Sequence, residues 1–236
     1  MRKSPGQRGL GPGRNRANFN FLLCYIISLL LTRHPAAHAL LASFPFPRTA
    51  MIRKNPRGDL PRIHPSAFID PTAILCGLVI VEENVFIGPY AVIRADEMDA
   101  ENRIEPIVIG AHSNIQDGVV IHSKSGARVL IGQRTSIAHR AIVHGPCTVG
   151  SGVFVGFNSV LFNCTVGDRC VVRYNAVVDG VCLPPGFHVR STERIGPDTD
   201  LLALPQVSAD ASEFSEDVAR TNNELVLGYK RIQNEF

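Results

Sequence analysis

The sequence predicts a parallel β-helix followed by a single C-terminal α-helix. Three observations favour this fold: aliphatic residues recur at every sixth position, glycine often follows them, and an amphipathic stripe ends the chain. Six residues turn an α-helix through about 1.67 turns, which would scatter the apolar positions around it. The same spacing suits one short strand and one turn per repeat, with three repeats closing a triangular coil.

Residues 1–50 are predicted to be a leader outside the β-helix. A basic stretch precedes the apolar run 21–31, and residues 37–39 (Ala-His-Ala) offer a cleavage site, which is the layout of a secretory signal. The run is shorter than the about 20 apolar residues of a membrane span, so no stable span is expected. Secretion, a periplasmic location or organelle targeting would follow. Alternatively, translation starts at Met51, residues 1–50 are never made, and the protein is cytoplasmic.

The β-helix is predicted over residues 51–190, in about seven coils. The in-phase aliphatic positions are Ile87, Ile93, Ile109, Ile115, Ile121, Ile131, Ile137, Val143, Val149, Val155 and Leu161, and, after a one-residue slip, Val166, Val172 and Val178. Each should point inward and stack on its equivalents in the neighbouring coils. Residues 97–106 and 123–130 break the rhythm and are expected to form protruding loops.

Residues 191–211 are predicted to be a linker, and residues 212–236 a C-terminal helix. Ser212 or Ser215 can cap its N-terminus, where acidic residues in the first turns are also favourable. Apolar residues at spacings of three, four or seven form one stripe: Phe214, Val218, Leu225, Tyr229, Ile232 and Phe236. The helix should therefore pack along the β-helix or against a neighbouring chain.

Charge and cysteine content limit the partners and the compartment. The first 58 residues carry ten of the 24 Lys and Arg and none of the 21 acidic residues, so the remainder is acidic. Nucleic acid is therefore excluded as a partner of the folded domain. Five cysteines follow the leader, embedded in aliphatic segments without close-pair spacing. They are interpreted as buried free thiols, which suit a reducing compartment.

Three histidines occupy positions in the repeat that suit a shared metal ion. His122 and His144 each follow an inward residue, three repeat steps apart, so they should lie on one face of adjacent coils, about 4.8 Å apart. His139 lies one repeat step before His144, on a different face, and should not reach the same ion within one subunit. An ion bound by all three must lie between two subunits, which suits a threefold assembly; chance stacking of two histidines is the alternative.

The segments that carry these histidines resemble gamma-class carbonic anhydrases. Residues 135–146 (TSIAHRAIVHGP) are similar to the family's metal-binding segment, residues 114–122 (NIQDGVVIH) to its first ligand segment, and residues 93–97 (IRADE) to its Arg-x-Asp segment. The similarity runs from about residue 60 to the C-terminus. It implies a left-handed β-helix and a homotrimer with three interfacial sites, each taking two histidines from one chain and one from the next.

The resemblance implies a metal-dependent reaction and roles for individual residues. Zn²⁺, or Fe²⁺ or Co²⁺, would be held by His122, His139 and His144 at each subunit interface, because imidazole accepts all three metals and three ligands leave one position open. The reaction would be the reversible hydration of CO₂ to bicarbonate and a proton. Gln116 would orient the hydroxide or CO₂, and Asn222 in the last helix would hydrogen-bond on the CO₂ side.

An ion pair is implied beside the metal. Arg94 and Asp96 should pair across the subunit interface, with Asp117 close by; a purely structural salt bridge is the alternative.

Two positions depart from the family's pattern. Ser125 stands where the best-known members carry a glutamate that exports protons, and Arg220 stands where the family has a tyrosine. Glu97 is the remaining carboxylate that could carry the proton. We therefore expect a slow or buffer-dependent enzyme.

Two other functional classes are compatible with the sequence. Acyl transfer from a coenzyme A thioester would need one histidine as a base and no metal, but three histidines with ligand-compatible placement and Gln116 count against it. A catalytically weak subunit of the same fold, which binds bicarbonate or serves assembly, is the other class, and Ser125 favours it.

Overall fold

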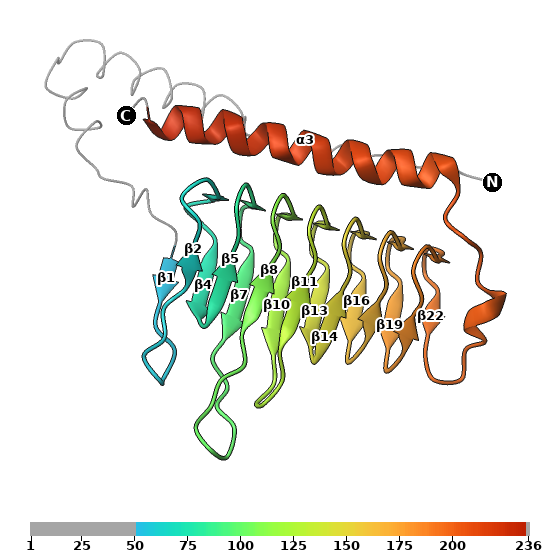
Figure 1. Cartoon of the computed structure of the whole chain (residues 1–236), viewed down its shortest axis with the longest axis horizontal. Helices are drawn as coiled ribbons and strands as arrows, with labels where there is room; N and C mark the ends of the chain where they lie inside the picture. Colours follow the sequence, from blue (N-terminus) through green and yellow to red (C-terminus); the bar gives the residue numbers. More distant parts are fainter. Residues whose placement is uncertain (1–50, 235–236) are drawn as a thin grey trace, which may run out of the picture. The chain divides into compact units, whose positions relative to one another are not determined.

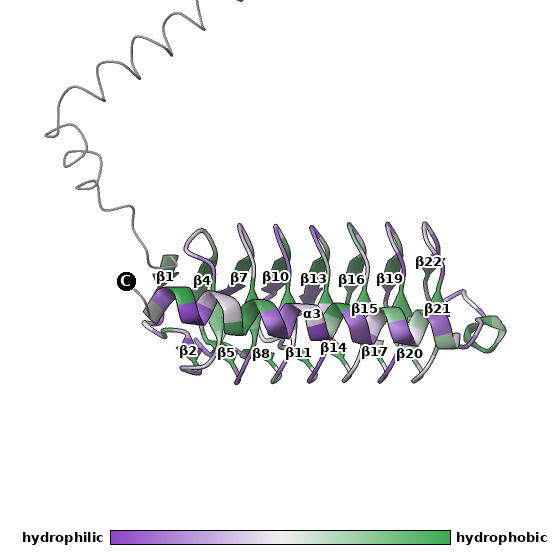
Figure 2. Ribbon diagram, turned by 90° about the horizontal axis from the view of Figure 1, so that it is seen from above, coloured by the Kyte–Doolittle hydropathy of each residue, from purple (hydrophilic) through white to green (hydrophobic). Residues whose placement is uncertain are grey.

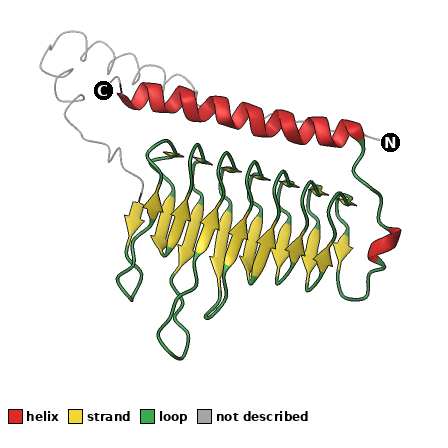
Figure 3. Cartoon of the chain, in the orientation of Figure 1, coloured by secondary structure: helices red, strands yellow, loops and turns green. Residues whose placement is uncertain are grey.

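The structure is a computed structural model and describes residues 51–234. The leader predicted at residues 1–50 lies outside the described residues, as do the last two residues of the predicted helix. Three parallel sheets wind around a common axis as a left-handed β-helix (Figures 1 and 3). The predicted fold of about seven coils with one C-terminal helix is therefore confirmed.

Each sheet takes every third strand of the chain. Sheet A contains β1 (Met51–Arg53), β4 (Ile74–Gly77), β7 (Val92–Ala95), β10 (Val120–Ser123), β13 (Ile142–Gly145), β16 (Val160–Phe162), β19 (Val177–Asp179) and β22 (Arg194–Ile195). Sheet B contains β2 (Arg62–Ile63), β5 (Val79–Val81), β8 (Ile107–Ile109), β11 (Val129–Ile131), β14 (Cys147–Val149), β17 (Thr165–Val166) and β20 (Cys182–Leu183). Sheet C contains β3 (Phe68–Ile69), β6 (Phe86–Ile87), β9 (Asn114–Ile115), β12 (Ser136–Ile137), β15 (Phe154–Val155), β18 (Val171–Val172) and β21 (His188–Val189).

The core is a column of aliphatic side chains along the axis of the coils. Every in-phase residue predicted to point inward is buried and belongs to one contiguous cluster. Burying a Val, Leu or Ile side chain stabilises a fold by about 1.5–3 kcal/mol. The hexapeptide spacing therefore stabilises the coils, because it places at least one such buried side chain in every strand from β4 to β22.

Of the five cysteines within residues 51–234, four are buried free thiols, and Cys182 is exposed, unlike the expectation. A hydrogen bond with Cys147, together with burial, raises the pKa of the Cys164 thiol. Burial likewise raises the pKa of the Cys170 thiol. Both groups are held in the unreactive neutral form, because the thiolate is the reactive species.

Two loops leave the corner between sheets A and B. Residues 96–106 connect β7 to β8, and residues 124–128 connect β10 to β11. They occupy the two places where the hexapeptide rhythm breaks, and they project together beyond the coils in Figure 1. The Ser125 hydroxyl donates a hydrogen bond to the Met98 carbonyl (2.7 Å), so the two loops are joined.

The C-terminal helix α3 (Ala209–Asn234) begins three residues earlier than predicted. The Ser208 hydroxyl accepts a hydrogen bond from the Ala211 amide (3.3 Å), so Ser208 takes the capping place predicted for Ser212 or Ser215. The coils also continue to β22, so the segment between β-helix and helix is shorter than expected and contains the 3₁₀ helix η1 (Leu201–Ala203).

Helix α3 covers the outer face of sheet C. It contacts β3, β6, β9, β12 and β18, and Figure 2 shows it between the strands of sheet A and those of sheet B. The predicted apolar stripe is confirmed in part: Phe214 lies against Phe154, Val218 packs on the same cluster, and Tyr229 stacks on Phe68. Leu225 and Ile232 are exposed, and the most buried positions of the helix are Ala211, Asn222 and Val226. Within residues 51–234, α3 included, no helix is long and apolar enough to cross a membrane.

Candidate metal centre

His122 and His144 lie side by side on sheet A. They are register partners on the adjacent strands β10 and β13, and their ring centroids are 5.2 Å apart. Both project from the outer face, because the residues before them, Ile121 and Val143, point into the core. The sheet therefore brings together the two histidines that the repeat spacing predicts to be neighbours.

Hydrogen-bond partners distinguish the two nitrogens of each ring. His144 Nδ1 lies 3.1 Å from the Gly145 carbonyl oxygen and donates to it, which leaves Nε2 with a lone pair. His122 Nε2 lies 3.3 Å from Asp96 Oδ1 and 3.5 Å from Glu97 Oε1. A metal ion bound to His122 Nε2 would therefore displace these two carboxylates. A metal ion bound to Nδ1 would leave both carboxylates in contact with Nε2.

Charged side chains surround His122 on the side of the preceding coil. Arg94 is its register partner on β7, and Arg94 Nη1 lies 2.9 Å from Asp96 Oδ2. The ion pair expected across a subunit interface is thus formed within one chain, because Asp96 follows β7 closely enough for its carboxylate to turn back. The Ser125 backbone amide donates a hydrogen bond to Glu97 Oε2 (3.1 Å). Ser125, which replaces the family's proton-exporting glutamate, thus holds Glu97, the carboxylate that could still carry the proton.

His139 lies apart from the other two histidines, in the turn between sheets C and A. The next residue, Arg140, has φ of +60°, and this left-handed conformation recurs at the same corner in the neighbouring coils. His139 Nδ1 lies 3.2 Å from Asp117 Oδ2. Within one chain, Asp117 is therefore the partner of His139, because it occupies this same corner one coil earlier. Its place beside the Arg94–Asp96 pair of another subunit stays a prediction.

An aromatic wall adjoins His139. Its ring lies 5.2 Å from Phe157 between centroids, and Phe157 stacks on Tyr174 at 4.7 Å. Asp117, His139, Phe157 and Tyr174 line an open cavity of about 670 Å³. On sheet A, His144 likewise has an aromatic neighbour: the centroid of the Phe162 ring lies 5.4 Å from that of the His144 ring.

The chain thus carries two partial sites. One contains His122, His144 and the carboxylates of Asp96 and Glu97, and the other contains His139 with Asp117. Among residues 51–234, no group of three or more His, Cys, Asp or Glu side chains of a single chain is placed to hold a metal ion.

Gln116 belongs to a buried polar cluster beneath α3. Gln116 Nε2 donates to Asn114 Oδ1 (2.8 Å), and Asn114 Nδ2 donates to the Ser136 hydroxyl (2.7 Å). Asn222 is buried as well, but its Nδ2 donates to the Val218 carbonyl of its own helix (2.9 Å). Sequence analysis missed Asn114 and Ser136, although both stand where the flanking coils have phenylalanine.

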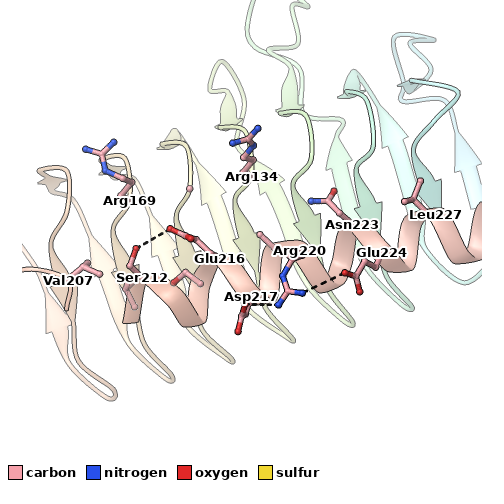
Figure 4. Close-up of a pocket in the computed structure, with 14 residues that line it drawn as sticks. Arg134, Arg169, Val207, Ser212, Glu216, Asp217, Arg220, Asn223, Glu224 and Leu227 are labelled. Carbon is pink, nitrogen blue, oxygen red and sulfur yellow. Dashed lines mark hydrogen bonds and ion pairs between the residues drawn. The ribbon is translucent and has the colours of Figure 1, made fainter. Parts of the chain in front are cut away.

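Another groove lies away from the histidines, between α3 and the corner that joins sheets B and C. Its volume is about 740 Å³. Figure 4 shows Arg220, which stands in the place of the family's tyrosine, among the residues that line it. Arg220 binds Asp217 (2.8 Å) and Glu224 (3.8 Å), and the Asp217 hydrogen bond raises the pKa of its guanidinium.

Known proteins similar to this chain were found by sequence. No protein-family model matches it. A carbonic anhydrase from Methanosarcina thermophila is 34% identical over 197 residues, which cover 75% of this chain and 77% of that protein. The carboxysome assembly protein CcmM from Nostoc is 38% identical over 178 residues, 71% of this chain but only 31% of that longer protein. The carnitine operon protein CaiE from Escherichia coli is 37% identical over 116 residues, 49% of this chain and 55% of that protein.

Solved structures share the fold. A Bacillus cereus protein classed as an acetyltransferase matches with a TM-score of 0.66 at 24% identity, over 78% of this chain and 99% of that one. A hexapeptide transferase family protein from Anaplasma phagocytophilum has a TM-score of 0.57 at 24% identity, over 76% of this chain and 98% of that one. These structures support the fold alone. The sequence match to a carbonic anhydrase over most of both chains is the stronger finding, and the chain belongs to the gamma-class carbonic anhydrase family.

Proposed function

We propose that the protein is an enzyme that catalyses the reversible hydration of CO₂ to bicarbonate and a proton, at metal sites shared between the subunits of a homotrimer. The observation that carries this proposal is the pair of partial sites on one chain. One offers two stacked histidines, and the other offers a histidine oriented by a carboxylate. Neither supplies three imidazoles by itself, but together they do.

The donor set fits a catalytic divalent ion. His139 and His144 each have Nδ1 engaged by an oxygen, which leaves Nε2 as the ligand atom; a carboxylate behind a ligating histidine is a common arrangement. His122 would be the third ligand. Three imidazoles suit Zn²⁺, Fe²⁺ or Co²⁺ and leave one position open. When bound by these residues, such an ion would supply Lewis-acid chemistry that makes water a nucleophile near neutral pH.

An exposed apolar row on sheet A supports the trimer. Outward-facing aliphatic residues continue in register from strand to strand beside the histidines: Met51, Ile74, Val92, Val120, Ile142, Val160 and Val177. Val120 and Ile142, which flank His122 and His144 along the strands, are 36% and 41% exposed. A continuous apolar row on a soluble surface is typical of an interface. We infer that the corner of a second subunit, with His139 and Phe157, covers it.

The remaining residues of the proposed site would bind and orient the reactants. The Gln116 amide is held by Asn114 and would orient the substrate or the attacking water. Asn222 would hydrogen-bond to CO₂ only after its side-chain amide gives up the hydrogen bond that it donates to the Val218 carbonyl. Glu97 is half exposed beside His122 and would accept the released proton. Because Ser125 adds no second carboxylate, we expect proton release to depend on buffer.

Mixing two inactive variants tests the shared site. His139→Ala and His144→Ala should each lose about 100-fold or more in CO₂ hydration, because every site lacks one ligand. In co-purified mixed trimers, sheet A of a His139→Ala subunit still carries His122 and His144, and the corner of a His144→Ala subunit still carries His139. Where these two surfaces meet, the site has all three histidines, and each mixed trimer contains one such interface. Because one of the three interfaces is complete, we expect about a third of the wild-type activity to return in the mixed trimers, together with a matching fraction of bound metal.

The control is His112→Ala, which changes a histidine at the corner between sheets B and C and should leave activity and metal content unchanged. No recovery in mixed trimers that are shown to form would contradict a shared site. A metal-free wild-type protein would contradict the proposal as a whole and would favour the acyl-transfer alternative.

A second candidate function is supported by Ser125 and by the relatives named as assembly proteins. In this alternative the trimer binds metal and bicarbonate but turns over slowly or not at all, and serves assembly. Stopped-flow hydration measurements on anaerobically prepared, iron- or zinc-loaded protein distinguish it from the enzyme. Full metal occupancy without hydration activity at any buffer concentration would favour the assembly function.

A further inference from the structure

We propose that the Tyr174 hydroxyl of one subunit donates a hydrogen bond to the Asp179 carboxylate of the next, and that this pair sets the register in which the three histidines meet. The proposal rests on the shared site of the proposed function and adds to it a polar contact two coils beyond His139. Two observations carry it: both sides of the proposed interface repeat once per coil, and Tyr174 and Asp179 stand at matching places on the two sides.

The outer row of sheet A that carries the histidines ends in an acidic residue. His122, His144, Phe162 and Asp179 are consecutive register partners, so each lies one coil, about 4.8 Å, beyond the last. Asp179 is half-buried, yet within residues 51–234 no group of its own chain hydrogen-bonds to its carboxylate or forms an ion pair with it. When a second subunit covers this face, an unpaired carboxylate would be strongly unfavourable. The neighbouring subunit must therefore supply a donor here.

The corner between sheets C and A carries a matching ladder of rings. His139, Phe157 and Tyr174 occupy equivalent positions in three successive coils, because the Asn158 amide donates to the His139 carbonyl (3.1 Å) and the Asn175 amide to the Phe157 carbonyl (2.8 Å). Each ring lies against the next, with centroids 5.2 Å and 4.7 Å apart. The three side chains therefore extend from the corner together, and a sheet that receives His139 also receives Tyr174.

The shared site determines how the two ladders face each other. In a closed trimer, equivalent residues lie at one height along the symmetry axis, and His139 must reach the histidine pair on the sheet A of the next subunit. Two coils further along both ladders, Tyr174 faces the interval between Phe162 and Asp179. A tyrosine bonded to an aspartate spans about the distance of two imidazoles joined by a metal ion, because the longer tyrosine offsets the shorter aspartate. The Tyr174 hydroxyl, which has no hydrogen-bond partner within residues 51–234, is thus placed to donate to Asp179.

A polar pair at this place does what the apolar row of sheet A cannot. The aliphatic residues of that row are similar in size and recur at every coil, so a displacement by one coil would preserve most apolar contacts. A displacement that moves His139 away from His122 would place the Phe157 ring against Asp179. One polar contact specifies register among apolar alignments that are otherwise equivalent. The Tyr174–Asp179 bond therefore favours the alignment in which all three histidines meet.

A double-mutant cycle on metal affinity tests the pair. Tyr174→Phe and Asp179→Ala change no proposed metal ligand, yet each should lower the affinity for Zn²⁺ about tenfold, because alignments with only two histidines become populated. Each variant should remain a trimer in analytical ultracentrifugation, because the apolar row is intact. The double variant should bind Zn²⁺ no more weakly than the weaker single variant, since either substitution removes the same contact. Competition with a chelator measures the affinity.

The matched controls change a tyrosine and an aspartate outside the proposed contact. Tyr229→Phe removes a hydroxyl on α3, and Asp198→Ala removes a carboxylate that pairs with Arg194 of its own chain. Both should bind Zn²⁺ as the wild-type protein does. Unchanged affinity in Tyr174→Phe or Asp179→Ala, losses that multiply in the double variant, or dissociation of the single variants would overturn the role of the pair in register.

A charge exchange gives a readout that depends on neither metal nor activity. In chelator-treated protein, Asp179→Lys should dissociate the trimer, because the new ammonium group would be buried near Arg173 of the next subunit, whose Cζ lies 4.5 Å from the Tyr174 ring centroid. Adding Tyr174→Glu should restore the trimer, because an ion pair then replaces the hydrogen bond.

The outcomes separate this contact from the proposed enzyme. A trimeric but inactive wild-type protein that shows the rescue would end the proposed catalysis and keep the contact. A trimeric Asp179→Lys variant, or no recovery with Tyr174→Glu, would end the contact even if the wild-type protein is active. A monomeric wild-type protein would end the shared site and the contact together.

Discussion

At the scale of single residues, the partner of each imidazole determines which nitrogen is left for a metal. His144 gives Nδ1 to a backbone carbonyl, and His139 gives Nδ1 to the Asp117 carboxylate. The Asp117–His139 pair could have been predicted, because its spacing of 22 residues equals that of the stacked pair Ile115 and Ile137. The burial of Ser136 beneath α3 could not have been predicted, because the sequence does not reveal which outward face of the β-helix the last helix covers.

Asp117→Asn tests the orienting carboxylate. An amide accepts a weaker hydrogen bond from His139 Nδ1, so we expect metal affinity to fall about 10- to 100-fold, as is typical when the partner of a ligating histidine is changed. Competition with a chelator measures this affinity. Asp70→Asn is the control, because Asp70 accepts only local bonds from Thr72. Equal affinities for the Asp117 and Asp70 variants would contradict the role of Asp117.

At the scale of elements, the register of α3 is determined by the surface of sheet C. Phe68 and Phe86 receive Val226, and the Phe68 ring stacks on Tyr229 with centroids 4.6 Å apart. Periodicity alone predicted Tyr229 on this face, but it also placed Leu225 there, which is 40% exposed, and it omitted the buried Val226. The choice between these adjacent positions depended on the partner surface, which the sequence does not show.

Val226→Ala should test this docking. Val226 is 1% exposed between two phenylalanine rings, so the substitution should reduce the free energy of unfolding by about 1–2 kcal/mol. The control, Leu227→Ala, changes a side chain that is 64% exposed and should have almost no effect. Denaturant unfolding followed by circular dichroism measures both. A loss in the Leu227 variant as large as that in the Val226 variant would show that the helix docks by another face.

At the scale of the whole molecule, the distribution of apolar surface fits the proposed trimer. Helix α3 covers sheet C, and the exposed aliphatic row of sheet A runs beside the stacked histidines. The same strands thus present a candidate interface and half of a candidate metal site. This coincidence links oligomerisation to function in the proposed enzyme.

Ile142→Glu should therefore dissociate the proposed trimer. A carboxylate in the centre of an apolar interface would have to be buried without a partner, which is strongly unfavourable. We expect monomers in analytical ultracentrifugation with an unchanged circular dichroism spectrum, and loss of bound metal. Thr148→Glu on the exposed face of sheet B is the control and should remain a trimer. A trimeric Ile142 variant with full metal content would contradict the assignment of sheet A as the interface.

The sequence by itself determined the coils, their inward residues and the stacking of His122 on His144, because a strict repeat converts spacing directly into position. It also determined the family, because the similarity spans most of the chain. The tertiary structure alone decided the burial of Val226 in place of Leu225 on α3, the intrachain Arg94–Asp96 pair and the buried contacts of Gln116. These depend on side chains that meet at corners and beneath a helix, where the six-residue period places no constraint.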